Sequence, residues 1–99
     1  MPQQDIRNEA NDFLMDALMS LENREEGYAC LEDLMTRREL EDLSQRLQVA
    51  KMLRGGFTYT EITAKTGASS ATIGRVNRAL TYGADGYNTV LDRLDGKNK

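Results

Sequence analysis

Hydrophobic residues recur along most of the chain at spacings of three and four, the pattern of an α-helix that packs on one side. The first stripe lies within residues 6–21 and consists of Ile6, Ala10, Phe13, Leu14, Ala17, Leu18 and Leu21. Shorter stripes follow in 28–35, 36–56, twice within 58–80, and in 85–95. No segment alternates with period two for long enough to predict a strand. We therefore expect an all-α protein of about six helices, with Asp95 to Lys99 as a frayed tail.

Helix boundaries are marked by capping residues and glycines. The segments 36–39 and 58–61 both read Thr-x-x-Glu, in which each side chain bonds the backbone amide of the other residue at the start of a helix. Gly55-Gly56 and Gly67 follow the next two helical segments. Glycine tolerates the left-handed backbone with which many helices end, so both are expected to be helix exits.

Residues 58–80 have the spacing of a helix-turn-helix unit: a short capped helix, a glycine turn and a second helix. Ile62, Ile73 and Val76 are expected to hold the two helices together. Small residues at the start of the second helix would let it enter the major groove of DNA. We expect base reading by Ser69, Ser70, Ala71 and Gly74, phosphate contacts from Thr58, Thr60, Lys65, Arg75 and Arg78, and Thr72 within the same interface. The alternative is a helical hairpin that docks on protein and does not bind DNA directly.

The charge distribution agrees with a DNA-facing half. The 99-residue chain, expected to form one domain over 1–99, carries a net charge of −3. Residues 1–35 hold nine acids and two bases, whereas residues 36–99 hold eleven bases and seven acids. The first part is thus an acidic helical arm and the rest is basic, although surface charge also fluctuates along chains without functional meaning.

Composition argues against several other classes. Histidine is absent and Cys30 is the single cysteine, which removes histidine-based triads, Cys/His zinc sites and internal disulfides. We expect no enzyme activity, no metal and no cofactor. Acidic neighbours argue that Cys30 is a small buried residue and not a redox sensor. There is no apolar run of membrane length and no signal-peptide pattern at the N-terminus, so a soluble cytoplasmic protein is expected.

The segment 34–80 carries a longer and more specific sequence pattern. It reads LMTRRELEDLSQRLQVAKMLRGGFTYTEITAKTGASSATIGRVNRAL and resembles the Trp repressor superfamily, in particular its bacterial YerC/YecD group. The resemblance covers about half of the chain closely. It implies an intertwined all-helical homodimer with two DNA-reading heads. The function it implies is a sequence-specific transcriptional regulator, as a repressor on a palindromic operator.

A homodimer is also expected from the residues alone. The stripe within 6–21 is wide, and a chain of this length has little material with which to cover it, so the stripe is a candidate interface. Two recognition helices related by a two-fold axis also read more sequence than one. The alternative is a compact monomer in which the first helix folds back over its own core.

The resemblance also implies an effector pocket for a small carboxylate, formed by Thr36, Arg46 and Arg75. Guanidinium groups suit this role because they pair with carboxylates and stack on rings. Four positions depart from the family pattern: Asp33, Met35, Val76 and Ala79 stand where the Trp repressor has two leucines, a glycine and a serine. These changes argue against tryptophan and leave a different ligand, or none, open. Without a ligand, Arg46 would pair with Glu39, Glu41 or Asp42 or with the partner chain, and Arg75 would contact phosphate.

Overall fold

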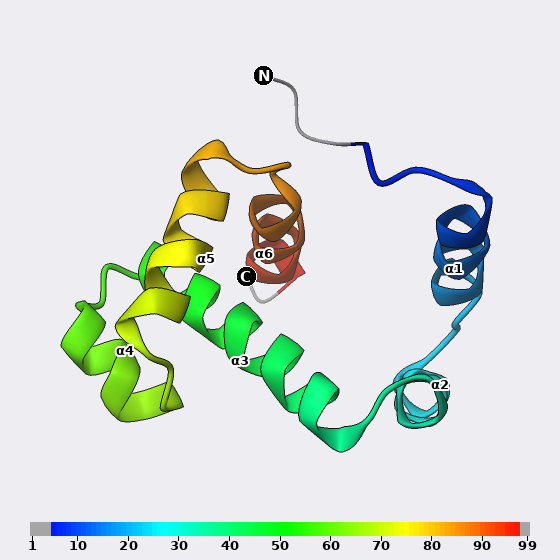
Figure 1. The fold of residues 1–99 in the computed structure, drawn as a ribbon, viewed down its shortest axis with the longest axis horizontal. Coiled ribbons are helices and arrows are strands. Elements are labelled where there is room, and N and C mark those ends of the chain that lie inside the picture. The colour runs from blue at the N-terminus through cyan, green and yellow to red at the C-terminus, as the bar shows by residue number, and fades with distance from the viewer. Residues whose placement is uncertain (1–4, 98–99) are drawn as a thin grey trace. The chain divides into compact units, whose positions relative to one another are not determined.

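The computed structural model of the chain describes residues 5–97 and shows six α-helices and no strand within that range (Figure 1). The prediction of an all-α fold with about six helices is confirmed. The helices are α1 (Glu9–Met19), α2 (Arg24–Leu34), α3 (Arg37–Arg54), α4 (Tyr59–Thr66), α5 (Ser70–Tyr82) and α6 (Gly86–Lys97).

The chain divides into two compact units, Met1–Arg37 and Arg38–Lys99. The first holds α1 and α2, and the second holds α4, α5, α6 and all of α3 except its first residue. The division falls close to the boundary predicted between the acidic arm (1–35) and the central helix (36–56). A single domain over 1–99 stays a prediction.

The first unit has helices, but none of its residues from 5 to 37 has a buried side chain. Asn8 caps α1 by accepting a hydrogen bond from the Asn11 backbone N–H at 2.7 Å, and Asn23 caps α2 in the same way. Neither helix contains a buried residue, and Phe13 and Met19 are 75% and 84% exposed. The apolar side chains of this unit, such as Phe13 and Met19, are therefore exposed to solvent.

Two details of the first unit differ from the sequence prediction. The stripe expected over 6–21 is longer than α1, because the Asn8 cap starts the helix after Ile6 and the helix ends at Met19, before Leu21. Cys30 is half-buried and not buried, and the rest of α2 likewise contains no buried residue.

The second unit is built around a small apolar core. Val49 and Ala50 of α3 and Ile62 of α4 are fully buried. The other members come from the turn after α4 and from α5 and α6: Ala68, Ile73, Val76 and Leu91. The predicted locking role of Ile62, Ile73 and Val76 is confirmed, and Tyr87 packs against this core. Each large side chain buried here contributes about 1.5–3 kcal/mol, so these few residues fix the unit.

The helix exits of the second unit follow the glycines. Gly56, two residues after α3, has φ 86°, and Gly67, after α4, has φ 77°, so both predicted left-handed exits are confirmed. The frayed tail predicted from Asp95 is wrong for residues 95–97, which continue α6, while 98 and 99 lie outside the described residues. Once Leu91 anchors a helix in the core, each further residue adds a hydrogen bond at low cost.

Candidate nucleic-acid interface

The turn between α4 and α5 is held by side-chain hydrogen bonds as well as by Gly67. The Thr66 hydroxyl accepts from the Ala68 backbone N–H at 3.1 Å, and the Thr63 hydroxyl donates to the Ala68 carbonyl at 3.0 Å. Ala68 itself is 1% exposed. A turn whose backbone groups are satisfied and whose central side chain is buried keeps one geometry. The direction of α5 relative to α4 is therefore fixed.

The N-terminus of α4 is closed by a capping box. The Thr58 hydroxyl accepts from the Glu61 N–H at 3.1 Å, while a Glu61 carboxylate oxygen accepts from the Thr58 N–H at 2.8 Å and from its hydroxyl at 3.1 Å. This confirms the second predicted box. The box predicted at 36–39 stays a prediction. The Glu61 carboxylate occupies this helix end, and the backbone N–H groups of Thr58 and Glu61 are satisfied from within the chain.

The N-terminus of α5 is built differently. Ser69 caps it by accepting from the Thr72 N–H at 3.1 Å, and its hydroxyl donates to that of Thr72 at 3.2 Å. Ser70 and Ala71 follow on the exposed surface, and the Ser70 hydroxyl makes no side-chain hydrogen bond within residues 5–97. The first turn contains no acid, so the positive end of the helix dipole is not compensated by a neighbouring carboxylate.

Cations lie on α5 beyond this tip. Arg75 and Arg78 are exposed, and neither forms an ion pair with any residue that the structure describes. Gly74, directly before Arg75, is half-buried and has open space where a Cβ would stand. The exposed tip and face of α5 therefore bring together Ser70, Ala71, Gly74, Arg75 and Arg78. Ser69 and Thr72 stand beside them as the cap.

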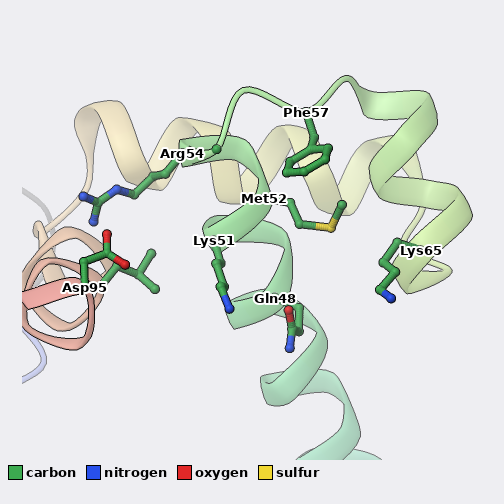
Figure 2. A pocket seen from close by; sticks show the side chains of 9 residues that line it. Gln48, Lys51, Met52, Arg54, Phe57, Lys65 and Asp95 are labelled. Atoms are coloured by element: carbon green, nitrogen blue, oxygen red, sulfur yellow. The ribbon is translucent and has the colours of Figure 1, made fainter. Parts of the chain in front are cut away.

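Two residues at α4 that were predicted to contact phosphate, Thr58 and Lys65, interact with other parts of the chain or line a cavity. The Thr58 hydroxyl is used in the capping box. Lys65 lines a cavity of about 650 Å³ together with residues of α3 and α6 (Figure 2). Thr60 is exposed, and its hydroxyl has no side-chain hydrogen bond in the described part of the chain, which leaves it available to a ligand.

The cavity in Figure 2 was not found by sequence reasoning. Met52, Phe57 and Leu91 give it an apolar wall, and Gln48, Lys51 and Lys65 add polar groups. The Phe57 N–H donates to the Met52 carbonyl at 3.2 Å, which turns the loop back over the end of α3. An aromatic residue directly after Gly55-Gly56 was the one available signal in the sequence.

The residues of the predicted effector pocket are distributed over both units. Thr36 belongs to the first unit, while half-buried Arg46 on α3 and exposed Arg75 on α5 belong to the second. Neither arginine lines the cavity of Figure 2. Val76, which stands where the Trp repressor has a glycine, is 2% exposed and part of the core. The effector pocket stays a prediction.

Within the described range 5–97, no group of three acidic or cysteine side chains is placed to hold a metal ion. None of the helices in that range combines the length and apolar character needed to cross a bilayer.

A helix-turn-helix unit within an all-α chain defines the class of protein, and comparison with known proteins gives the family. The sequence profile of the Trp repressor protein family matches residues 9–95. A protein of Bacillus subtilis (strain 168) named YerC, itself uncharacterized, is 48% identical over 89 residues, covering 90% of this chain and 86% of YerC.

Solved structures agree with this result. The crystal structure of a candidate Trp repressor from Staphylococcus aureus has a TM-score of 0.87 and 52% identity, covering 91% of this chain and 90% of that one. That of a TrpR-like protein from Eubacterium eligens ATCC 27750 has a TM-score of 0.88 and 50% identity, covering 91% and 93%. The chain belongs to the Trp repressor family.

The capping box gives a direct test of the two threonine roles on α4. Thr58→Ala should lower the free energy of unfolding by about 1 kcal/mol, because it removes a cap hydrogen bond. Thr60→Ala, two residues further on, should leave it nearly unchanged, since that hydroxyl bonds to no described side chain. Urea denaturation followed by circular dichroism measures both, and equal losses would contradict the assignment.

Proposed function

We propose that this protein is a sequence-specific DNA-binding transcriptional regulator, a repressor that acts as a homodimer on a palindromic operator. The observation that carries the proposal is the tip of α5, where Ser70 and Ala71 are exposed and the first helical turn has no acid. A helix end with small side chains fits the major groove, which is about 12 Å wide. The proposed role is binding to DNA and not catalysis. A protein with this role would act in the cytoplasm, where it meets the DNA.

The two helix ends of the reading head support a division of roles. Phosphate is attracted to the N-terminus of a helix by unpaired amides and by the dipole. On α4 that position is taken by the Glu61 carboxylate, whereas on α5 no side-chain carboxylate occupies it. The α5 end can therefore approach the duplex without repulsion from its own helix.

Individual residues receive roles according to which of their groups are free. Ser70 would form hydrogen bonds to base edges, and Ala71 and Gly74 would allow close approach. Thr60, Arg75 and Arg78 would bind phosphates, because their polar groups have no hydrogen bond or ion pair with described side chains. Ser69, Thr72 and Thr58 would act mainly by capping the helices that carry these groups, and Lys65 would stand at the edge of the interface.

A homodimer is the second part of the proposal. The exposed apolar residues of α1 and α2, including Phe13, Met19 and Tyr28, form a surface that an isolated chain leaves in water. Opposite charge supports self-association, because residues 1–35 are acidic and residues 36–99 are basic. Two copies related by a two-fold axis would place their α5 helices on half-sites about 34–36 Å apart.

For the effector, we propose that the regulator works without tryptophan. The side chain of Val76 fills space in the core that a glycine would leave open, and Ala79 offers no hydroxyl. Arg46 and Arg75 would remain able to bind another small carboxylate or, on the DNA side, a phosphate.

Paired substitutions on α5 test the DNA-binding role. Arg78→Ala should weaken binding to all duplexes and reduce the salt slope by about 1, because a phosphate contact is removed. Ser70→Ala should instead change which base pair is preferred at the contacted position, by altering the difference in binding free energy between base pairs there by about 1–3 kcal/mol. Fluorescence anisotropy at several salt concentrations, with duplexes obtained by in-vitro selection, measures both.

The matched control is Arg93→Ala, which removes an exposed cation of α6 outside the reading head and should leave the slope unchanged. Binding without any salt dependence, or no binding by the parent protein, would favour the protein-docking alternative over a DNA regulator.

Substitution on α1 tests the dimer. Phe13→Ser should raise the dimer dissociation constant about a hundredfold or more, because each of two symmetric copies loses a buried ring. Sedimentation equilibrium should give twice the chain mass of 11.1 kDa for the parent and a shift toward monomer for the variant. Asp12→Ser, its polar neighbour, should stay dimeric; a monomeric parent would refute the dimer.

Calorimetric titration tests the effector proposal. Tryptophan added to the purified protein, with and without duplex DNA, should give no binding heat in the micromolar range, because the pocket positions differ from those of the Trp repressor. A DNA titration of the same sample shows that the protein is active. Saturable micromolar binding of tryptophan would contradict the proposal.

A further inference from the structure

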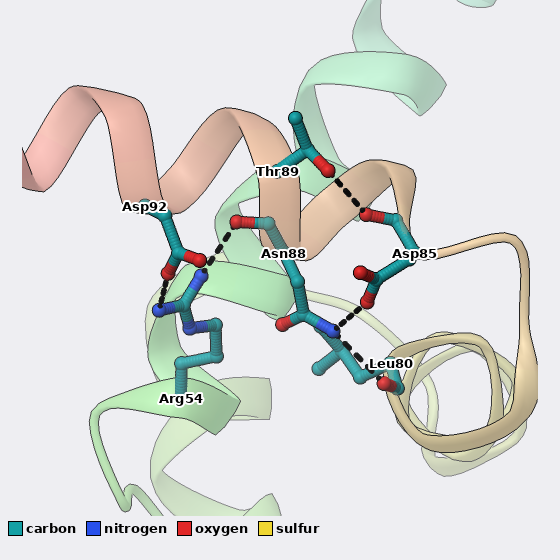
Figure 3. A network of polar contacts seen from close by, with 6 residues as sticks. All are labelled: Arg54, Leu80, Asp85, Asn88, Thr89 and Asp92. Carbon is teal, nitrogen blue, oxygen red and sulfur yellow. Dashed lines mark hydrogen bonds and ion pairs between the residues drawn. The ribbon is translucent and has the colours of Figure 1, made fainter.

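The two ends of α5 are held by different interactions. Its first half is anchored in the apolar core by Ile73 and Val76, which are 0% and 2% exposed. Near its C-terminus Leu80 is half-buried and packs against the same core, and carbonyls in the last turn of a helix have no partner within the helix. The Leu80 carbonyl finds its partner outside α5, where the Asn88 side-chain amide donates to it at 3.0 Å (Figure 3).

Asn88 is itself fixed from two sides. The same side-chain nitrogen donates to an Asp85 carboxylate oxygen at 2.9 Å, and the backbone carbonyl of Asn88 accepts from Arg54 Nη1 at 3.3 Å. The other terminal nitrogen of Arg54 pairs with the carboxylate of Asp92, one turn further along α6. A continuous set of polar contacts therefore runs from the last residue of α3 through α6 to the end of α5.

Asp85 gives this network a fixed starting point. Its φ of 71° makes it the one non-glycine residue in the described range with a left-handed backbone, a conformation that aspartate tolerates better than most residues. Its carbonyl accepts from the Thr89 hydroxyl at 3.0 Å. The turn between α5 and α6 is thus closed from its own residues, and the Asp85 carboxylate faces Asn88.

We propose that Asn88 is a positioning residue for sequence reading: it fixes the C-terminal end of α5, and so the direction in which the α5 tip enters the groove. The inference rests on the proposed DNA-binding function. Hydrogen bonds to base edges depend steeply on distance and angle, whereas contacts to phosphates act largely through charge. Without Asn88, the C-terminal end of α5 keeps the packing of Leu80 against the core but loses its directional hydrogen bond. The helix then keeps its charge but loses alignment, so selectivity falls more than affinity for arbitrary DNA.

The experiment compares Asn88→Ala with Thr89→Ala. Both substitutions remove a hydrogen-bonding side chain at the start of α6, but only Asn88 reaches α5. Binding is measured to a duplex obtained by in-vitro selection with the parent protein and to a scrambled duplex of equal length. Asn88→Ala should reduce the preference for the selected duplex about tenfold, with the scrambled duplex bound as by the parent. Thr89→Ala should keep the preference.

A second pair of variants keeps the test decisive if Asn88→Ala does not fold. Asp85→Asn retains an oxygen acceptor and tolerates the left-handed backbone, so it should bind like the parent. Asp85→Gly keeps the backbone but removes the acceptor, so it should lose preference in the same direction as Asn88→Ala. Melting temperatures are recorded for all variants. A merely structural role would lower the melting temperature and leave the preference intact at temperatures where the protein is folded.

The outcomes separate the two proposals. A parent protein that does not distinguish the two duplexes would overturn sequence-specific binding, and this inference with it. A selective parent whose preference survives both Asn88→Ala and Asp85→Gly would overturn the positioning role alone. An equal loss of affinity for both duplexes in Asn88→Ala would also overturn it.

Discussion

The packing of Ile62 against Ile73 and Val76, over Val49 and Ala50 of α3, is the interaction on which the rest of the second unit depends. A chain of this length buries only about 60–65% of its unfolded surface, so the core of seven buried residues found between positions 5 and 97 leaves little excess stability. The core fixes the angle between α4 and α5 because all three large side chains are in van der Waals contact with a filled interior. Truncating any of them would allow the angle between α4 and α5 to vary and would also lower the free energy of unfolding.

The polar groups around this core fall into two sets. One set is used within the chain: Thr58 with Glu61, Ser69 with Thr72, and Thr63 and Thr66 with the turn. The other set, which includes Ser70, Arg75 and Arg78, faces outward and bonds to no described side chain. The first set makes the reading head rigid, and the second would supply its contacts with DNA. A rigid support with unbonded polar groups on one face is the arrangement that recognition of a fixed ligand requires.

The first unit, α1 and α2, supports the proposal that the protein associates with a second copy. Its helices are well capped by Asn8 and Asn23 but bury nothing, and exposed apolar side chains such as Phe13 are costly in water. Helices as short as the 11 residues of α1 and α2 are marginal when isolated. Both facts support association with a second copy, which agrees with the proposed symmetry of the operator. Membership of the Trp repressor family is consistent with this arrangement. In the proposed complex, residues on α5 would select the DNA sequence that is bound.

Local sequence determined the features that depend on neighbours along the chain. The helical periods, the Thr58–Glu61 capping box and the left-handed exits at Gly56 and Gly67 were all readable, because each is set by residues within one or two turns. Resemblance over 34–80 added the family. Only the tertiary structure showed which hydroxyls remain unbonded, that Lys65 lines a cavity with α3, and that Asn88 joins α6 to Leu80. These facts depend on residues distant in sequence that meet after the core has formed, and no periodicity or spacing encodes them.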